Sequence, residues 1–385
     1  YYLGQLDLTG KFNTGSIQHT VLAGADLDQY KTRTPAFKII YDPQNPQVNT
    51  YDVINIYDLS AFPQRSDIPE AQKVSLANNR VSRAGIYVQD LVALTSKIKL
   101  LAGLRYTYSE TNSATYTYST NLSKTAAPRS DDAFTPRLGL VLQPTAQMSL
   151  FASYANSFNL NKGIDASGSP LAPSFIDQYE LGIKNELFNG ALSANVTAYK
   201  IVNSNLAQTI LQTDPLFNPQ YPTAQQLSGE VTSKGVELDV MSRTFHGISV
   251  IAGYSFNDTR YTRSQIYQVG SSLRYNPKHT ANASINYAFT DNQFKGLNLG
   301  ITAQYFGDRY AGRSTRLTVQ NDQFRLMPLE AFTQLDATAG YSKENISLRF
   351  KISNLLNAMN YFAHDDNSLN PIAPRQFATT LAYKF

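Results

Sequence analysis

Apolar and polar residues alternate with a period of two in one segment of this chain after another. The last eleven residues, RQFATTLAYKF, place Phe377, Leu381 and Phe385 on one face and polar residues such as Lys384 on the other. This alternation predicts a strand whose two faces meet different environments. A soluble domain usually lets its last residues fray in water. An apolar stripe that continues to the final phenylalanine therefore indicates apolar surroundings at the end of the chain.

The same alternation predicts about fifteen strands, and no segment has a convincing helical period. The strand lengths suit tilted strands that cross a bilayer, which need about 9–11 residues. No run of about 18 apolar residues occurs, so the sequence excludes a transmembrane helix. The mean hydropathy of −0.31 does not argue against a membrane protein, because barrel strands alternate lipid-facing and polar residues. The predicted strands cover 2–12, 17–30, 82–94, 97–109, 133–143, 147–156, 177–188, 191–202, 232–243, 247–257, 278–289, 296–306, 331–341, 346–355 and 375–385.

The connections between these strands are alternately short and long along the whole chain. The short ones include the Asn189-Gly190 pair, which is typical of a two-residue hairpin turn. Short turns at one edge of a sheet and long loops at the other predict an all-β, transmembrane, antiparallel up-and-down β-barrel. A soluble β-sandwich is the alternative, but its strands are usually shorter. The long connections cover 31–81, 110–132, 157–176, 203–231, 258–277, 307–330 and 356–374.

Aromatic residues gather at both ends of the predicted lipid-facing stripes, as expected for side chains at the two membrane interfaces. With the long loops outside the cell, the outer girdle contains Tyr106, Tyr108, Tyr154, Tyr254, Phe256 and Tyr305. The inner girdle contains Phe12, Tyr287, Phe289, Tyr341, Tyr383 and Phe385. The opposite stripe is charged, with residues such as Asp26, Arg105, Asp336 and Lys351, and is expected to line the lumen and to pair across strands.

Several stretches resemble, in order, the barrel of TonB-dependent siderophore receptors. They include FTPRLGLVLQP, QYELGIKNELFNGALSANVTAYKI, SKGVELDV, LRFKISNLLNAMNYF and the terminal APRQFATTLAYKF. The resemblance covers essentially the whole chain. It implies that residues 1–385 are the C-terminal part of a barrel with about 22 strands. An N-terminal plug domain and an energy-coupling box are then expected outside this sequence. An odd number of strands also cannot close as an all-antiparallel barrel, which favours the same interpretation.

The composition offers little for catalysis or for nucleic-acid binding. The chain contains no cysteine, and its four histidines are scattered without metal-ligand spacing. No serine, histidine and acid can be assembled into a hydrolase site. The net charge of +4 is small, and no block of lysine and arginine is present. We therefore expect no enzyme activity, no catalytic residue, no metal site and no nucleic-acid partner.

Candidate ligand-binding residues lie in the later long loops, where aromatic and basic side chains occur together. Tyrosine and arginine can stack on a bulky, often anionic chelate and neutralise its charge. Alternatively, any one of them anchors a loop end at the interface or contacts lipopolysaccharide phosphate. The candidates are Tyr261, Arg263, Tyr267, Arg309, Tyr310, Tyr361 and His364.

The resemblance implies a receptor of the bacterial outer membrane that takes up ferric siderophores. The chain itself is expected to bind no cofactor, because iron arrives inside the chelate. The implied partners are the ferric siderophore, the TonB–ExbB–ExbD energy-coupling complex, the barrel-assembly machinery and outer-membrane lipid. Two different functions are also compatible with the pattern: uptake of another nutrient, such as vitamin B12 or an oligosaccharide, and passage through a passive porin.

Overall fold

The computed structural model describes residues 1–41, 44, 55, 57–58, 60, 70–317, 319, 322, 326–363 and 368–385. These residues form β-strands and their connections, and a short 3-10 turn, η2 (Asn292–Phe294), lies between β12 and β13. In the described part of the chain, no helix is both long and apolar enough to span a membrane.

Fifteen strands pair in the order of the sequence, from β1 at one end of the order to β20 at the other. Every pairing with a resolved register is antiparallel, as in an up-and-down sheet. The strands are β1 (Tyr2–Thr14), β2 (Ile17–Ile40), β3 (Glu70–Ala93), β4 (Ile98–Thr117), β6 (Arg129–Thr145), β7 (Met148–Asn159), β8 (Ser174–Leu187), β9 (Leu192–Thr209), β10 (Gln225–Ser242), β11 (Ile248–Arg263), β12 (His279–Ala288), β13 (Leu297–Phe306), β16 (Phe332–Lys343), β17 (Ile346–Ser353) and β20 (Gln376–Tyr383).

The fifteen strands predicted from the alternation are confirmed, but several extend further than predicted. Strands β2 and β3 each contain 24 residues and enter the predicted loop 31–81, which is therefore shorter. Their added halves do not alternate because polar residues occupy both faces. Five short strands occur within predicted loops: β5 (Leu122–Thr125), β14 (Arg309–Ala311), β15 (Met327–Leu329), β18 (Tyr361–Ala363) and β19 (Leu369–Pro371).

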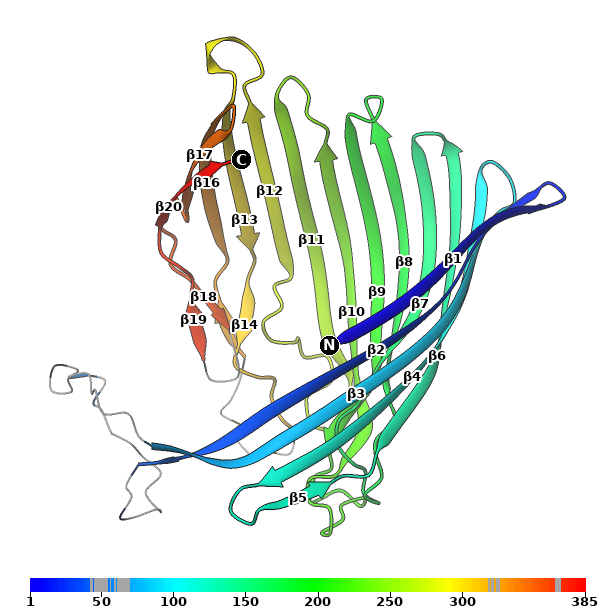
Figure 1. The fold of residues 1–385 in the computed structure, drawn as a ribbon, viewed down its shortest axis with the longest axis vertical. Coiled ribbons are helices and arrows are strands. Elements are labelled where there is room, and N and C mark those ends of the chain that lie inside the picture. The colour runs from blue at the N-terminus through cyan, green and yellow to red at the C-terminus, as the bar shows by residue number, and fades with distance from the viewer. Residues whose placement is uncertain are drawn as a thin grey trace. The chain divides into compact units, whose positions relative to one another are not determined.

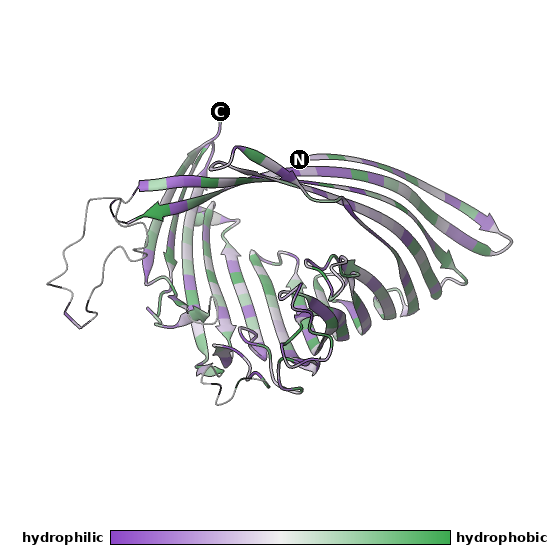
Figure 2. Ribbon diagram, turned by 90° about the horizontal axis from the view of Figure 1, so that it is seen from below, coloured by the Kyte–Doolittle hydropathy of each residue, from purple (hydrophilic) through white to green (hydrophobic). Residues whose placement is uncertain are grey.

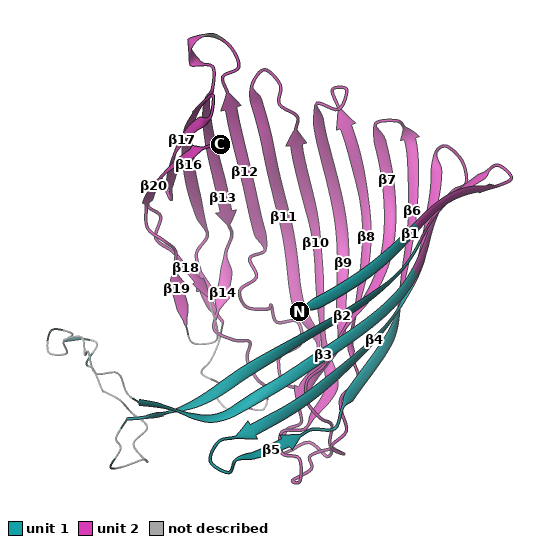
Figure 3. Ribbon diagram, viewed as in Figure 1, with its two compact units in different colours: residues 1–8, 23–87, 105–134 teal, residues 9–22, 88–104, 135–385 magenta. Residues whose placement is uncertain are grey.

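The chain divides into two compact units, which are described separately (Figure 3). Unit 1 contains residues 1–8, 23–87 and 105–134, and unit 2 contains residues 9–22, 88–104 and 135–385. In unit 2, the short connections between β7 and β20 lie at one end of the strands and the long connections lie at the other (Figure 1). We call these the turn end and the loop end.

Hydrophobic and hydrophilic residues alternate along the strands (Figure 2). Because successive side chains point to opposite faces, this alternation gives the two faces of the sheet in unit 2 different polarity. Ile285 pairs with Ile301, and both are apolar yet 54% and 55% exposed. On the other face, the Lys351 ammonium lies 3.0 Å from the Asp336 carboxylate. An apolar face that no protein group covers is the lipid-facing side of a barrel wall, and the polar face is its lumen side. The predicted cross-strand pairing of lumen charges is confirmed for Asp336, and in unit 1 for Asp26 with Arg105 at 2.6 Å.

Close cross-strand packing on the lumen side of unit 2 requires glycine at position 235. A β-carbon there would lie 2.3 Å from the Phe256 carbonyl oxygen and 2.5 Å from the Tyr199 ring. The tyrosine therefore lies over the glycine, an arrangement known to support glycine in sheets.

We predict that Gly235→Ala destabilises the barrel by about 1–3 kcal/mol, because the backbone of β11 must move to admit the methyl group. Gly10→Ala is the matched control, since a β-carbon at Gly10 meets no atom within 4 Å. The measurement is urea unfolding in detergent, and the fraction folded at each urea concentration is read from the heat-dependent migration of folded barrels on gels. Equal midpoints for the two variants contradict the prediction.

Candidate ligand-binding loops

Hydrogen bonds join neighbouring long loops of unit 2 in series at the loop end. The series starts with loop 160–173 and loop 210–224. The Gln225 amide donates to the Ile164 carbonyl at 2.8 Å, and the Asn218 side chain donates to the Ala166 carbonyl at 2.7 Å. These two loops therefore support each other above β8, β9 and β10.

Gln208, a buried residue near the end of β9, continues the series to loop 264–278. Its Nε2 donates to the Ser264 hydroxyl at 2.8 Å, and its Oε1 accepts from the Gln265 amide at 3.0 Å. One amide side chain thus fixes the start of the next loop with both of its polar atoms.

Loop 264–278 is joined in turn to loop 307–331 through backbone groups. The Tyr275 amide donates to the Tyr310 carbonyl at 2.8 Å, and the Leu317 amide donates to the Ile266 carbonyl at 2.8 Å. These hydrogen bonds join backbone groups and do not depend on the identity of the side chains. They hold the two loops together as one layer.

Arg309 joins loop 307–331 to loop 354–375. Arg309 is only 4% exposed. Its guanidinium donates hydrogen bonds to the Glu330 carbonyl at 3.0 Å, to the Asn360 side chain at 2.7 Å and to the Tyr361 carbonyl. The guanidinium also lies 5.0 Å from the centre of the Phe332 ring. Burial lowers the pKa of Arg309, and the nearby Asp308 opposes that shift.

The remaining described candidates present aromatic and basic groups at the same end. The rings of Tyr261 and Tyr267 stack with centroids 4.8 Å apart, and burial raises the pKa of Tyr261. Arg263 lies 3.8 Å from the Glu230 carboxylate. Tyr310 and Tyr361 are 37% and 44% exposed.

The positions of these residues do not test whether any of them contacts a ligand, so the predicted ligand contacts remain predictions. Tyr310 and Tyr361 are exposed, and Tyr267 is half-buried against Tyr261. Arg309 directs its donors at protein carbonyl and amide oxygens, so it acts on its surroundings as a positioning residue. His364 lies outside the described residues.

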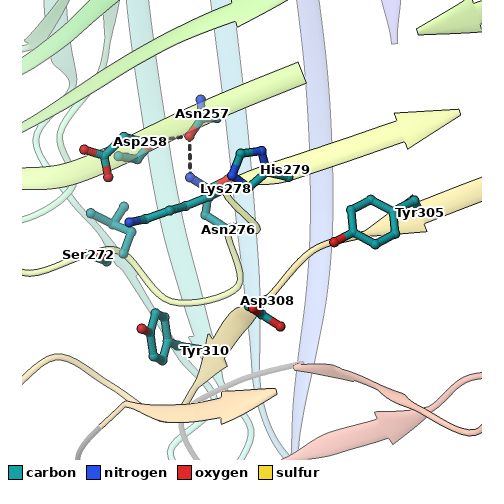
Figure 4. A pocket seen from close by; sticks show the side chains of 11 residues that line it. Asn257, Asp258, Ser272, Asn276, Lys278, His279, Tyr305, Asp308 and Tyr310 are labelled. Carbon is teal, nitrogen blue, oxygen red and sulfur yellow. Dashed lines mark hydrogen bonds between the residues drawn. The ribbon is translucent and has the colours of Figure 1, made fainter. Parts of the chain in front are cut away.

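A pocket of about 280 Å³ opens beside Tyr310, between β11, loop 264–278 and the end of β13 (Figure 4). Asp258 and Asp308 give it negative charge, Lys278 gives it positive charge, and His279 adds an imidazole ring. The carboxylate of Asp258 accepts from Arg260 Nε at 2.8 Å, and this bond lowers the pKa of Asp258.

Sequence reasoning did not identify this pocket. Short polar residues such as Asn257 and Asn276 are ordinary in loops, and only the fold joins their side chains. The one signal in the sequence was the cluster of ionisable residues in NDTRY and NPKHT. Within the described ranges, no group of three histidine, aspartate or glutamate side chains could hold a metal ion.

The chain belongs to the family of TonB-dependent receptor β-barrels. The family model, described as "TonB dependent receptor-like, beta-barrel", matches residues 1–355. Barrels of this family reside in the outer membrane of Gram-negative bacteria, and the family consists of receptors and transporters. Short turns then face the periplasm and long loops face the exterior.

Curated relatives agree with this assignment. The chain is 27% identical over 384 residues to the metal-pseudopaline receptor CntO of Pseudomonas aeruginosa, covering 99% of this chain and 51% of the relative. It is 26% identical to the ferrichrome outer membrane transporter/phage receptor of Escherichia coli, covering 98% of this chain and 47% of the relative. The chain thus spans about half the length of these relatives.

Solved structures share the fold. The siderophore receptor PiuA of Acinetobacter baumannii aligns with a TM-score of 0.77 at 21% identity, covering 100% of this chain and 55% of that one. The ferric-catecholate import receptor Fiu of E. coli aligns with a TM-score of 0.77 at 18% identity, covering 100% of this chain and 54% of that one.

We predict that Arg309→Lys loosens the connection between loops 307–331 and 354–375. An ammonium group cannot reproduce the planar set of donors that Arg309 directs at three residues. Losing these charge-assisted bonds should speed amide exchange at Ala331 and Tyr361 by roughly ten- to a hundred-fold. Hydrogen exchange measured by mass spectrometry tests this, with Arg243→Lys at the turn end as the control. Unchanged exchange at both amides contradicts the role given to Arg309.

Proposed function

We propose that this chain forms the later barrel strands and loops of an outer-membrane receptor for TonB-energised uptake of ferric siderophores. The observation that carries the proposal is the family match over residues 1–355. The printed names of curated relatives support the substrate class. They include receptors for ferrichrome, ferrioxamine B and ferric pyoverdine.

The joined loops supply a site for ligand capture. The exposed Tyr310 and Tyr361 and the half-buried Tyr267 offer ring faces for stacking on a chelate, and Arg263 offers a positive charge. Because the loops are hydrogen-bonded in series, contact with a ligand at one of them is transmitted to its neighbours. Iron reaches this site as cargo within the chelate, and the chain supplies no ligand to the metal.

The partners follow from this function. The TonB–ExbB–ExbD complex would act on a plug domain inside the barrel, and residues 1–385 would provide the wall that holds the plug. Asp336 and Lys351 form a lumen pair 3.0 Å apart. Because the lumen face is polar, such pairs can exchange their mutual contact for contacts with polar groups of a plug. The barrel-assembly machinery and outer-membrane lipid complete the proposed set.

A chelate of another metal is the second candidate substrate, because the relative at 27% identity is named as a metal-pseudopaline receptor. Uptake assays in cells that lack their own receptors separate the two. The substrates are radiolabelled ferric siderophores and the matching nickel and zinc chelates. Energy-dependent uptake of the ferric chelates alone is expected, and uptake of the nickel or zinc chelates would favour the second candidate.

The same cells test the two functions that differ most from siderophore uptake. Energy-dependent uptake of vitamin B12 or of an oligosaccharide, without uptake of any chelate, would identify a receptor for another nutrient. Steady ion conductance of the purified protein in planar bilayers would identify a passive porin. We expect neither result.

We predict that Tyr310→Ala combined with Tyr361→Ala weakens binding of the transported chelate by roughly tenfold or more, because each ring–cation or ring–chelate contact contributes about 0.5–2 kcal/mol. Phe188→Ala is the matched control, because Phe188 is an exposed aromatic residue at a tight turn. Binding to whole cells is measured with a fluorescently labelled chelate. Equal affinity in both variants contradicts the placement of the ligand, although it leaves the uptake function intact.

A further inference from the structure

Three asparagine–glycine pairs lie on the lumen side of unit 2, each on a different pair of neighbouring strands. Ile285 and Ile301 face lipid, so the residues next to each of them in the sequence face the lumen. In every pair, an asparagine amide atom lies 2.5–2.9 Å from the position that a β-carbon of the glycine would take. The amide therefore lies flat across the glycine and protrudes little into the lumen. The directly opposed pairs are Asn282 with Gly253, Asn286 with Gly300, and Asn298 with Gly340.

The part of the wall that holds these pairs carries no charge. It consists of the lumen-facing residues of β12, of β13 and of β11 between Ser249 and Thr259, and we call it the neutral stripe. The structure describes all of these residues, and none of them is acidic or basic. Most are amides, hydroxyls or glycines, and the hydroxyls of Ser284 and Thr302 are hydrogen-bonded to each other at 3.1 Å. The stripe thus offers neutral donors and acceptors along the length of its strands.

Charged residues border the neutral stripe on both sides. Glu237 and Asp239 lie on β10, where the register pairs them with residues of the stripe on β11. On the other side lie Asp336 of β16 and Lys351 of β17, whose charged groups are 3.0 Å apart. The lumen side of the wall is therefore acidic at β10, neutral from β11 to β13, and charged with both signs at β16 and β17.

A plug inside the barrel would be held less firmly by the neutral stripe than by its charged borders. Hydrogen bonds to charged groups are roughly twice as strong as those between neutral groups. A contact between neutral groups also contributes little net free energy, because each group can bond to water instead. A pull on the plug from the periplasm is therefore expected to break the contacts along the stripe first.

The neutral stripe also suits a hydrophilic cargo that must move past it. A path conducts when binding at each position is strong enough to admit the cargo and weak enough to release it. Amides and hydroxyls repeat along the stripe, so a chelate can exchange one hydrogen bond for a similar one at the next position. A charged side chain would instead hold a chelate of opposite charge in one place.

We propose that the ferric chelate passes along the neutral stripe, through an opening between the stripe and the plug. This inference rests on the proposed uptake function and adds to it the side of the wall on which the passage opens. The asparagine–glycine pairs leave room beside the wall, and the neutral groups guide the chelate without retaining it. The stripe is separate from the loop residues assigned to ligand capture.

The test places single cysteines on the wall of the full-length receptor, since residues 1–385 contain none. Any cysteine in the rest of the receptor is first replaced by serine. Ser284→Cys reports on the neutral stripe, and Thr302→Cys is a second reporter in case the first variant does not fold. Ser153→Cys is the matched control, because Ser153 faces the lumen from β7 and donates to the Glu180 carboxylate at 3.0 Å. All three substituted residues are half-buried.

Labelling is measured with a fluorescent maleimide added outside whole cells. The chelate is whichever of ferrichrome, ferrioxamine B and ferric pyoverdine the parent receptor takes up fastest. Adding it to energised cells should raise the labelling rate of the Ser284→Cys variant by roughly tenfold or more, because a covered thiol reacts in proportion to the open population. The labelling rate of the Ser153→Cys variant should stay nearly constant. Label attached at position 284 should then block uptake and leave binding of the chelate to the cells unchanged.

The outcomes separate this inference from the function on which it rests. Heat-dependent gel migration first confirms that each variant is folded. If the parent takes up the chelate and labelling rises equally at positions 284 and 153, or at 153 alone, the inference is overturned. Uptake without a rise at either position means that the plug stays on the stripe during transport, and it overturns the inference too. Uptake of none of the three chelates contradicts the proposed function, and the inference falls with it.

Discussion

The need to pair every backbone amide and carbonyl inside a hydrocarbon layer governs the rest of this structure. Without water to accept or donate hydrogen bonds, a strand can cross a membrane only beside two other strands. The sequential antiparallel order from β1 to β20 meets that need for every strand between its two ends. Because backbone hydrogen bonds hold the strands together, the side chains do not need to form a central apolar core. One face of the sheet can therefore be apolar and exposed, while the other carries charged residues such as Asp336 and Lys351.

The loop layer is stabilised in a different way from the wall. Several of the buried apolar residues of unit 2, including Leu171, Ile210 and Phe332, are in or beside the long loops. The layer thus has buried apolar residues of its own, and Gln208 and Arg309 satisfy several of its polar groups. The wall depends on lipid and on ladder hydrogen bonds, whereas the loops pack in the manner of a water-soluble protein.

The wall could be predicted from the sequence because lipid on one side and water on the other impose a period of two on each strand. That signal disappears where both faces meet water, so the outer halves of β2 and β3 were missed, as were the three-residue strands β14 and β18. The stacked Tyr261 and Tyr267 were identified as candidates, but their mutual contact was not. The burial of Arg309 could not be predicted from GDRYAGR, because it depends on Asn360 and Tyr361, some fifty positions away.

The serial joining of the loops restricts how the outer surface formed by this chain can change. Arg309 presents one fixed guanidinium to acceptors contributed by two different connections, and the Tyr275 amide requires a carbonyl at a set position in the next one. A single loop transplanted from another receptor would lack its hydrogen-bond partners, because those partners lie in the neighbouring loops that were not transplanted with it. Specificity in such a layer is therefore expected to be inherited as a block, with neighbouring loops exchanged together between related genes rather than one at a time.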